Sequence, residues 1–239
     1  MALLALHAVS KSYGALKVTD DITLAVTEGE TLGILGPNGA GKTTLFNLIS
    51  GDVRVDAGRV EYAGRDVTRL KPHQRCHAGI GRSYQVPQPF GNMSVFENLV
   101  TAACFGGQQT EREAWKTAHE VLEQTGLMAH ANKPASGLTL LDRKRLELAR
   151  ALATKPQLLL LDEIAGGLTE PEAAVLVDEL KRIKARGVTM IWIEHVVHAL
   201  LSLADRLLVI NFGQKLAEGE PRVVMNDPEV RRVYMGMEA

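Results

Sequence analysis

The 239-residue chain has little cysteine, no CxxC pair and no long apolar run. Its two cysteines, Cys76 and Cys104, are far apart in the sequence, which is typical of reduced thiols in a cytosolic protein. A membrane-spanning helix needs about 18 largely apolar residues, and no stretch of the chain approaches that length. Any work at a membrane would therefore be done as a bound subunit.

An excess of basic charge is also missing, because 27 Lys and Arg residues oppose 28 Asp and Glu residues, for a formal net charge of -1. Proteins that bind nucleic acids usually carry a basic excess, so we expect no nucleic-acid partner. The apolar start, MALLALHAV, lacks the basic segment and the small-residue cleavage site of a signal peptide. We therefore expect a first β-strand there.

What the chain has is the composition of a folded α/β protein, with 46% hydrophobic and 23% charged residues. Apolar patterns predict strands at 2–10, 22–27, 31–35, 59–62, 158–162, 188–193, 206–210 and 215–218, with turns at 13–14 and 211–213. They predict helices at 43–50, 94–104, 110–126, 142–154 and 170–186. Pro87 and Pro89 precede the middle helices, so we expect a helical subdomain at about 86–155, inserted in the α/β core of one domain that spans residues 1–239.

A glycine-rich loop follows the strand at 31–35 and precedes the helix at 43–50. It fits the pattern GxxxxGK[ST], whose backbone N–H groups turn inward around phosphates at the positive end of a helix. Lys42 would reach the β- and γ-phosphates, and Thr43 would bind Mg²⁺. The residues expected at the nucleotide are Gly36, Pro37, Asn38, Gly39, Ala40, Gly41, Lys42, Thr43 and Thr44.

The apolar strand at 158–162 ends in two acids, Asp162 and Glu163. A buried parallel strand places its C-terminal residues at the ligand edge of a sheet. Asp162 would hold Mg²⁺ through a water, and Glu163 would polarise the water that attacks the γ-phosphate. A strand that ends at a solvated acid pair is the alternative, which the glycine-rich loop disfavours. Together the two motifs predict a nucleoside triphosphatase.

In their order along the chain, these motifs and further elements resemble the ATP-binding cassette (ABC) family over nearly the whole sequence. Tyr13 lies where the family has an aromatic ring that stacks on adenine, and Gln85 matches the glutamine loop, which senses Mg²⁺ and water and faces the membrane subunit. His195, after Glu194, matches the switch histidine at the γ-phosphate. The resemblance implies an ATPase with a P-loop NTPase (RecA-like) core, an N-terminal antiparallel β-subdomain, and ATP and Mg²⁺ as cofactors. Glu163, His195, Gln85 and Lys42 are then the expected catalytic residues.

Two segments depart from the family pattern. Leu138–Asp142 stands where the family usually has LSGGQ, so that two leucines replace the glycines and an aspartate replaces the glutamine. Only Thr139 keeps a hydroxyl there, and we expect it to contact the ATP of a partner subunit. Thr169 stands where the family usually has aspartate. Both segments would serve the partner's ATP, whereas the residues for the chain's own ATP are intact.

Within the family, the chain is similar to the ATPases of bacterial branched-chain amino-acid importers. The resemblance rests on segments FGNMSVFENL, RKRLELARAL and EHVVHALLSLADRLLVINFGQKLAEGEP, and on the terminal Tyr234-Met-Gly. It implies a peripheral subunit at the cytoplasmic face of the inner membrane. Its expected partners are two transmembrane permease subunits, a second ATPase subunit and, indirectly, a periplasmic binding protein. A heterodimer of ATPases is expected, with a homodimer as the alternative.

Other functions stay open at this point. The ATPase does not touch the cargo, so related importers of urea, amides or aromatic acids share these motifs. A cassette that acts on nucleic acid or ribosomes would usually have two cassettes or a long coiled coil, and a small-molecule kinase would need neither Gln85 nor His195. We further hypothesise that the leucines in Leu138–Asp142 obstruct the partner's γ-phosphate and make that ATP site slow. They could instead point into the helical subdomain and leave the backbone path unchanged.

Overall fold

The computed structural model describes residues 2–235 and divides the chain into two units. Both ends of the chain, Met1–Arg75 and Thr189–Ala239, belong to the first unit, and the second unit is Cys76–Val188. Gly236, the end of the terminal motif, lies outside the described residues. The extent of the single domain, 1–239, and of its helical subdomain, 86–155, stays a prediction.

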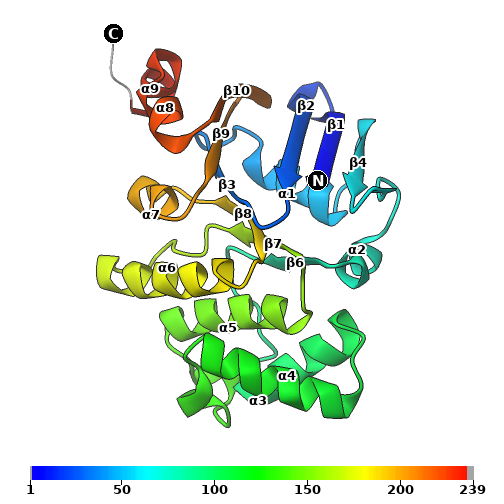
Figure 1. The fold of residues 1–239 in the computed structure, drawn as a ribbon, viewed down its shortest axis with the longest axis vertical. Helices are drawn as coiled ribbons and strands as arrows, with labels where there is room; N and C mark the ends of the chain where they lie inside the picture. Colours follow the sequence, from blue (N-terminus) through cyan, green and yellow to red (C-terminus); the bar gives the residue numbers. More distant parts are fainter. Residues whose placement is uncertain (1, 236–239) are drawn as a thin grey trace. The chain divides into compact units, whose positions relative to one another are not determined.

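An antiparallel sheet forms the N-terminal part of the first unit, with strand order β2-β1-β4-β5. Figure 1 shows β2, β1 and β4 in that order. Its strands are β1 (Ala2–Tyr13), β2 (Leu16–Thr27), β4 (Ala57–Tyr62) and β5 (Arg65–Asp66). Leu4 is fully buried and lies between Val26 of β2 and Tyr62 of β4. The predicted strand at 22–27 is too short by six residues, because β2 continues its pairing with β1 back to Leu16.

A mostly parallel group of strands, in the order β10-β9-β3-β8, completes the sheets of the first unit. Its members are β3 (Thr31–Leu35), β8 (Thr189–Ile193), β9 (Arg206–Asn211) and the antiparallel β10 (Gln214–Gly219). Every residue of β3 and β8 is buried, as expected for strands covered on both faces. The helices of this unit are α1 (Lys42–Ser50), α7 (Val197–Leu201), α8 (Pro221–Asn226) and α9 (Pro228–Met235), and α2 (Pro72–Ala78) crosses the boundary between the units.

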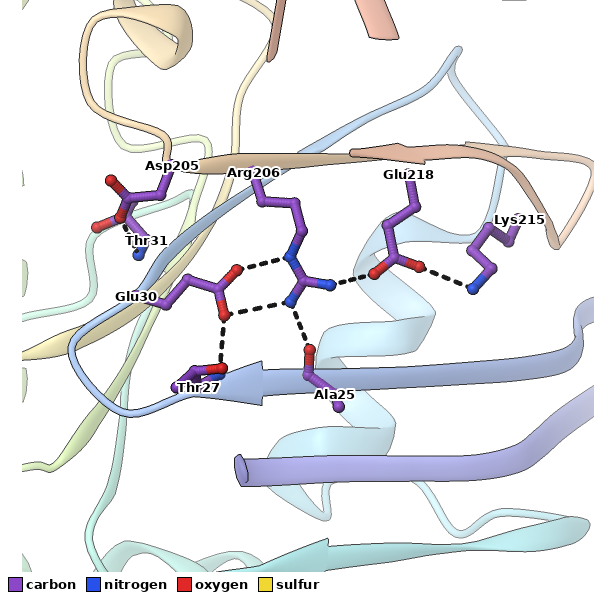
Figure 2. Close-up of polar contacts among 8 residues, drawn as sticks. All are labelled: Ala25, Thr27, Glu30, Thr31, Asp205, Arg206, Lys215 and Glu218. Carbon is purple, nitrogen blue, oxygen red and sulfur yellow. Dashed lines mark hydrogen bonds and ion pairs between the residues drawn. The ribbon is translucent and has the colours of Figure 1, made fainter. Parts of the chain in front are cut away.

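Arg206, the first residue of β9, ties together strands of both sheets of the first unit (Figure 2). Its guanidinium donates to Glu30 Oε1 at 2.6 Å, to the Ala25 carbonyl of β2 and to Glu218 of β10. Bonds between arginine and carboxylates are short and charge-assisted, and here they raise the pKa of Arg206 against the opposing effect of burial. The cluster fixes the end of β2 against the start of β9.

The second unit contains two parallel strands and a group of helices. The strands, β6 (Ile80–Ser83) and β7 (Leu158–Asp162), pair directly. The helices are α3 (Val95–Thr101), a π-helical turn at Ala102–Gly106, α4 (Glu111–Gln124), short 3₁₀ turns at Met128–His130 and Ala135–Gly137, α5 (Leu140–Ala153) and α6 (Glu170–Lys184). In the part of the chain from 2 to 235, no helix is both long and apolar enough to cross a bilayer.

Side-chain caps set where these helices begin. Ser94, Thr110 and Thr169 each form a capping box with a glutamate three residues later, at the starts of α3, α4 and α6. Thr139 caps α5 in a similar way, so that α5 begins at Leu140 rather than at the predicted residue 142. The predicted helix at 94–104 is only partly α-helical, because the π-helical turn replaces its last turn.

Candidate nucleotide-binding site

The phosphate-binding loop lies between β3 and α1 in the first unit. Gly39 and Gly41 adopt left-handed backbone conformations, with φ of 79° and 101°. A Cβ on Gly41 would lie 2.2 Å from the Val18 carbonyl oxygen, so that only glycine fits this approach of the loop to β2. The loop ends at the N-terminus of α1, where backbone N–H groups and the helix dipole favour an anion.

Lys42 is the first residue of α1 and is only 6% exposed. Its ammonium donates to the carbonyl oxygens of Gly36 at 2.7 Å and Pro37 at 3.0 Å, both within the same loop. The cation is therefore held inside the loop that would surround the phosphates. Thr43, the next residue, is exposed.

A buried arginine, which the sequence analysis missed, holds the other end of α1. Arg75 is 1% exposed and donates to the carbonyl oxygens of Leu48 at 2.6 Å, Ile49 at 2.7 Å and Thr68 at 2.9 Å. Burial lowers the pKa of Arg75 to about 10. The first two bonds satisfy carbonyl groups that lack partners in the last turn of a helix, and so anchor α1.

Tyr13 ends β1 in the same unit and is 49% exposed. The Lys11 ammonium lies 5.5 Å from the centre of its ring, within the range of a cation–π contact. An accessible ring of this kind can stack on a planar base. His195 follows β8 and is exposed, and its backbone N–H donates to Oε1 of the buried Glu194 at 3.0 Å.

The β9–β10 hairpin turn connects the phosphate loop to β2. The Gly213 N–H donates to the Ala40 carbonyl at 3.0 Å, and the Asp20 N–H donates to the Gly213 carbonyl at 2.8 Å. The phosphate loop and β2, which pairs with β1, thus both form backbone hydrogen bonds with Gly213.

In the second unit, the two acids lie at the C-terminal end of β7, as the strand pattern predicts. The Asp162 carboxylate forms an ion pair with Arg82 at 3.1 Å, and both side chains are less than a tenth exposed. Glu163 is partly exposed and accepts a hydrogen bond from the Gln85 side-chain amide. The structure thus brings Gln85 and Glu163 into direct contact.

Lys144 of α5 also meets this pair, and the sequence analysis did not identify it. Its ammonium donates to the Gln85 carbonyl at 2.6 Å and to the Glu163 carbonyl at 3.3 Å, and the residue is 4% exposed. A signal was present in the sequence: Lys144 lies one helical turn before Leu148, on the apolar stripe of its helix, where a charge needs a specific partner.

The segment in place of the family signature forms the first turn of α5. The Thr139 hydroxyl accepts from the Asp142 N–H and donates to the Asp142 carboxylate, which also contacts His130 and Arg145 at 3.4 Å each. Leu140 is 39% exposed, and a Cβ on Gly167 would lie 3.5 Å from its side chain. Leu140 is therefore partly exposed and lies next to Gly167, two residues before Thr169.

The residues expected at Mg²⁺ carry oxygen ligands of the kind that this ion prefers: the Thr43 hydroxyl, the Asp162 carboxylate and the Gln85 amide. Among residues 2–235, no cluster of three or more His, Cys, Asp or Glu side chains is arranged to hold a metal. This donor set fits an ion that is bound mainly through nucleotide phosphates and water, as Mg²⁺ usually is.

The family models, relatives and solved structure that follow are all described as ABC transporters or as ATP-binding proteins of transport systems. A family model described as "ABC transporter" matches residues 19–166, and one described as "Branched-chain amino acid ATP-binding cassette transporter" matches residues 214–236. The high-affinity branched-chain amino acid transport ATP-binding protein LivG of Salmonella typhimurium is 34% identical over 98% of each chain. The lipopolysaccharide export ATP-binding protein LptB of Haemophilus influenzae is 34% identical over 99% of this chain and 98% of its own. A crystal structure described as the ADP conformation of an ATP-binding cassette of an ABC transporter superposes with a TM-score of 0.88 at 32% identity, over 99% of this chain and all of the other.

Proposed function

This chain belongs to the ABC transporter family, as an ATPase subunit, and we propose that it powers the import of branched-chain or related amino acids. The family, the ATP-hydrolysing activity and the P-loop NTPase fold class predicted from the sequence are confirmed. The transported solute, the site residues and the composition of the assembled transporter belong to the proposal.

The single observation that favours amino-acid import is the C-terminal match at residues 214–236 to a model of branched-chain amino-acid cassettes. Identity over the whole chain does not discriminate, since the LivG and LptB relatives are both 34% identical. Export of a lipopolysaccharide is therefore the competing function, which the LptB relative supports.

In the proposed mechanism, the loop N–H groups and Lys42 bind the phosphates of ATP, and Tyr13 stacks on the adenine. Thr43 and Asp162 would each supply an oxygen ligand to Mg²⁺, which would neutralise charge on the phosphates. Glu163 orients a water for attack on the γ-phosphorus and accepts its proton. Gln85 keeps the Glu163 carboxylate in place through the hydrogen bond between their side chains.

His195 is the last of the four expected catalytic residues. In this proposal it contacts the γ-phosphate and senses when the bond to that phosphate is cleaved. Its side chain is exposed after the buried strand β8, where it is accessible to a ligand. Cleavage breaks the bond between the γ-phosphorus and the bridging oxygen, and yields ADP and inorganic phosphate.

The proposed assembly has two ATPase subunits, two transmembrane permease subunits and a periplasmic binding protein that delivers the solute. The ATPase pair lies peripherally at the cytoplasmic face of the membrane. We propose that the partner ATPase is a different chain with an ordinary signature. This chain's Thr139 hydroxyl already caps α5, and the exposed Leu140 adds bulk where the family has glycine, so the site it completes would turn over slowly.

Reconstitution of the transporter tests the proposal. The chain is co-purified with its permease subunits, placed in lipid vesicles and supplied with Mg-ATP and the purified binding protein. The expected result is that binding protein loaded with leucine stimulates ATP hydrolysis and drives uptake of leucine, whereas unloaded binding protein does not. Stimulation by urea or lipopolysaccharide, with no response to any branched-chain amino acid, would assign another solute.

A further inference from the structure

Glu163 has an unusual backbone. Its φ is 47°, in the left-handed region that residues with a side chain rarely adopt. Such a conformation persists only where surrounding contacts impose it, and it tends to occur where function requires a fixed side chain. Two donors bind the Glu163 carbonyl oxygen, the Gly166 N–H at 3.1 Å and the Lys144 ammonium at 3.3 Å.

Lys144 also binds the glutamine loop, through the Gln85 carbonyl at 2.6 Å. One buried ammonium therefore joins the backbones of two residues whose side chains bind each other. Burial of a cation is costly unless it is fully hydrogen-bonded. The carbonyl groups of Gln85 and Glu163 supply such bonds to the buried Lys144 ammonium.

We propose that Lys144 is a positioning residue for ATP hydrolysis. Its ammonium holds the left-handed backbone of Glu163 next to the Gln85 loop, so that the carboxylate stays where it can orient the attacking water. This inference rests on the role proposed above for Glu163. In this proposal Lys144 acts through Glu163 alone.

The position of Lys144 in α5 gives it a second consequence. Thr139 caps this helix, and Lys144 lies five residues later, on the same rigid element. A displacement of the first turn of α5 would therefore move the ammonium that holds Glu163. A change in the segment Leu138–Asp142, which we expect to meet the partner's ATP, would in this way alter the position of this chain's own Glu163 carboxylate.

The test compares Lys144→Met, Lys144→Gln and a control, Lys181→Met, in the assembled transporter. Lys181 is an exposed residue of α6 with one surface ion pair to Asp178. Lys144→Met is expected to lower kcat about 10²-fold, the effect of a misplacement of about 1 Å, with an unchanged KM for Mg-ATP and a modestly lower Tm, because two backbone carbonyl groups lose a donor. Lys144→Gln, which keeps a donor but reaches less far, should give an intermediate kcat, and Lys181→Met the wild-type value.

A double-mutant cycle with Glu163→Gln separates this inference from the proposed function. If Lys144 acts through Glu163, Lys144→Met causes no further loss of the residual rate in the Glu163→Gln background. Two outcomes would overturn the inference about Lys144 and leave the role of Glu163 intact. One is that the rate losses of Lys144→Met and Glu163→Gln multiply in the double variant. The other is a wild-type kcat in folded Lys144 variants. A lower Tm with unchanged kcat per folded molecule would also overturn it, in favour of a structural lysine. Wild-type turnover by Glu163→Gln itself would instead overturn the role proposed for that residue.

Discussion

The hairpin turn at Gly213 offers a stringent test of how the phosphate loop is held. Gly213 has a φ of 76°, and a Cβ built on it would lie 2.6 Å from the Val18 carbonyl oxygen. Gly64, in the turn between β4 and β5, is a matched control with a φ of 73° and no heavy atom within 4 Å of such a Cβ. The two alanine variants therefore share the backbone strain and differ in the close contact.

The expected magnitudes follow from these two effects. A left-handed alanine costs about 1–2 kcal/mol in either turn. At Gly213, the methyl group must also displace the backbone of β2, which adds about 1–3 kcal/mol. Because the Gly213 N–H binds the Ala40 carbonyl of the phosphate loop, we expect Gly213→Ala also to weaken ATP binding, about tenfold or roughly 1.4 kcal/mol.

The assay is urea unfolding together with equilibrium binding of Mg-ATP for both variants. Gly64→Ala should lose only the strain contribution and keep the ATP affinity of the wild type. Gly213→Ala should be the less stable of the two and bind ATP more weakly. Equal losses of stability, with the same ATP affinity in both variants, would refute the argument that this turn holds the phosphate loop.

Three further predictions concern single residues. Lys42→Ala should abolish most nucleotide affinity, because it removes the charge on the β- and γ-phosphates; equilibrium binding measures this. Arg75→Met should lower the free energy of unfolding by about 3 kcal/mol, since it leaves buried carbonyl groups at the end of α1 without donors; urea unfolding checks it. The Thr110 hydroxyl and N–H lower the pKa of Glu113 from 4.5, so the unfolded state binds more protons between the lowered pKa and 4.5. The stability advantage over Glu113→Gln should be complete above pH 4.5 and disappear as the pH falls through the lowered pKa, as thermal unfolding at several pH values will show.

Much of the fold could be predicted from local patterns. The strands at 31–35 and 158–162 were predicted at the residues where they occur, because each is a short apolar run that ends at a loop with a chemical signature. β6 was missed, since the sequence Ile-Gly-Arg-Ser has little strand character of its own and is a strand through its pairing with β7. The helices α2, α7, α8 and α9 were also missed. Each has only five to eight residues, too few for a clear helical period.

In the candidate site, too, local motifs predict some residues, whereas others can be recognised only in the folded structure. The identities of Lys42, Asp162 and Glu163 follow from motifs, because those motifs fix residue types at fixed spacings. The contacts of Lys144 and Arg75 do not, because both side chains bind backbone carbonyl groups far away in the sequence. Carbonyl groups leave no trace in residue identity, so only the fold reveals which cation they bind.

In the proposed mechanism this chain hydrolyses ATP with its own acid pair, Asp162 and Glu163. The most direct measurement is steady-state ATP hydrolysis by the assembled transporter with Glu163→Gln, together with its affinity for Mg-ATP. We expect a turnover about 10²–10⁴-fold lower, the usual contribution of a positioned base, with ATP binding largely unchanged. Wild-type turnover in the Glu163→Gln transporter would contradict it.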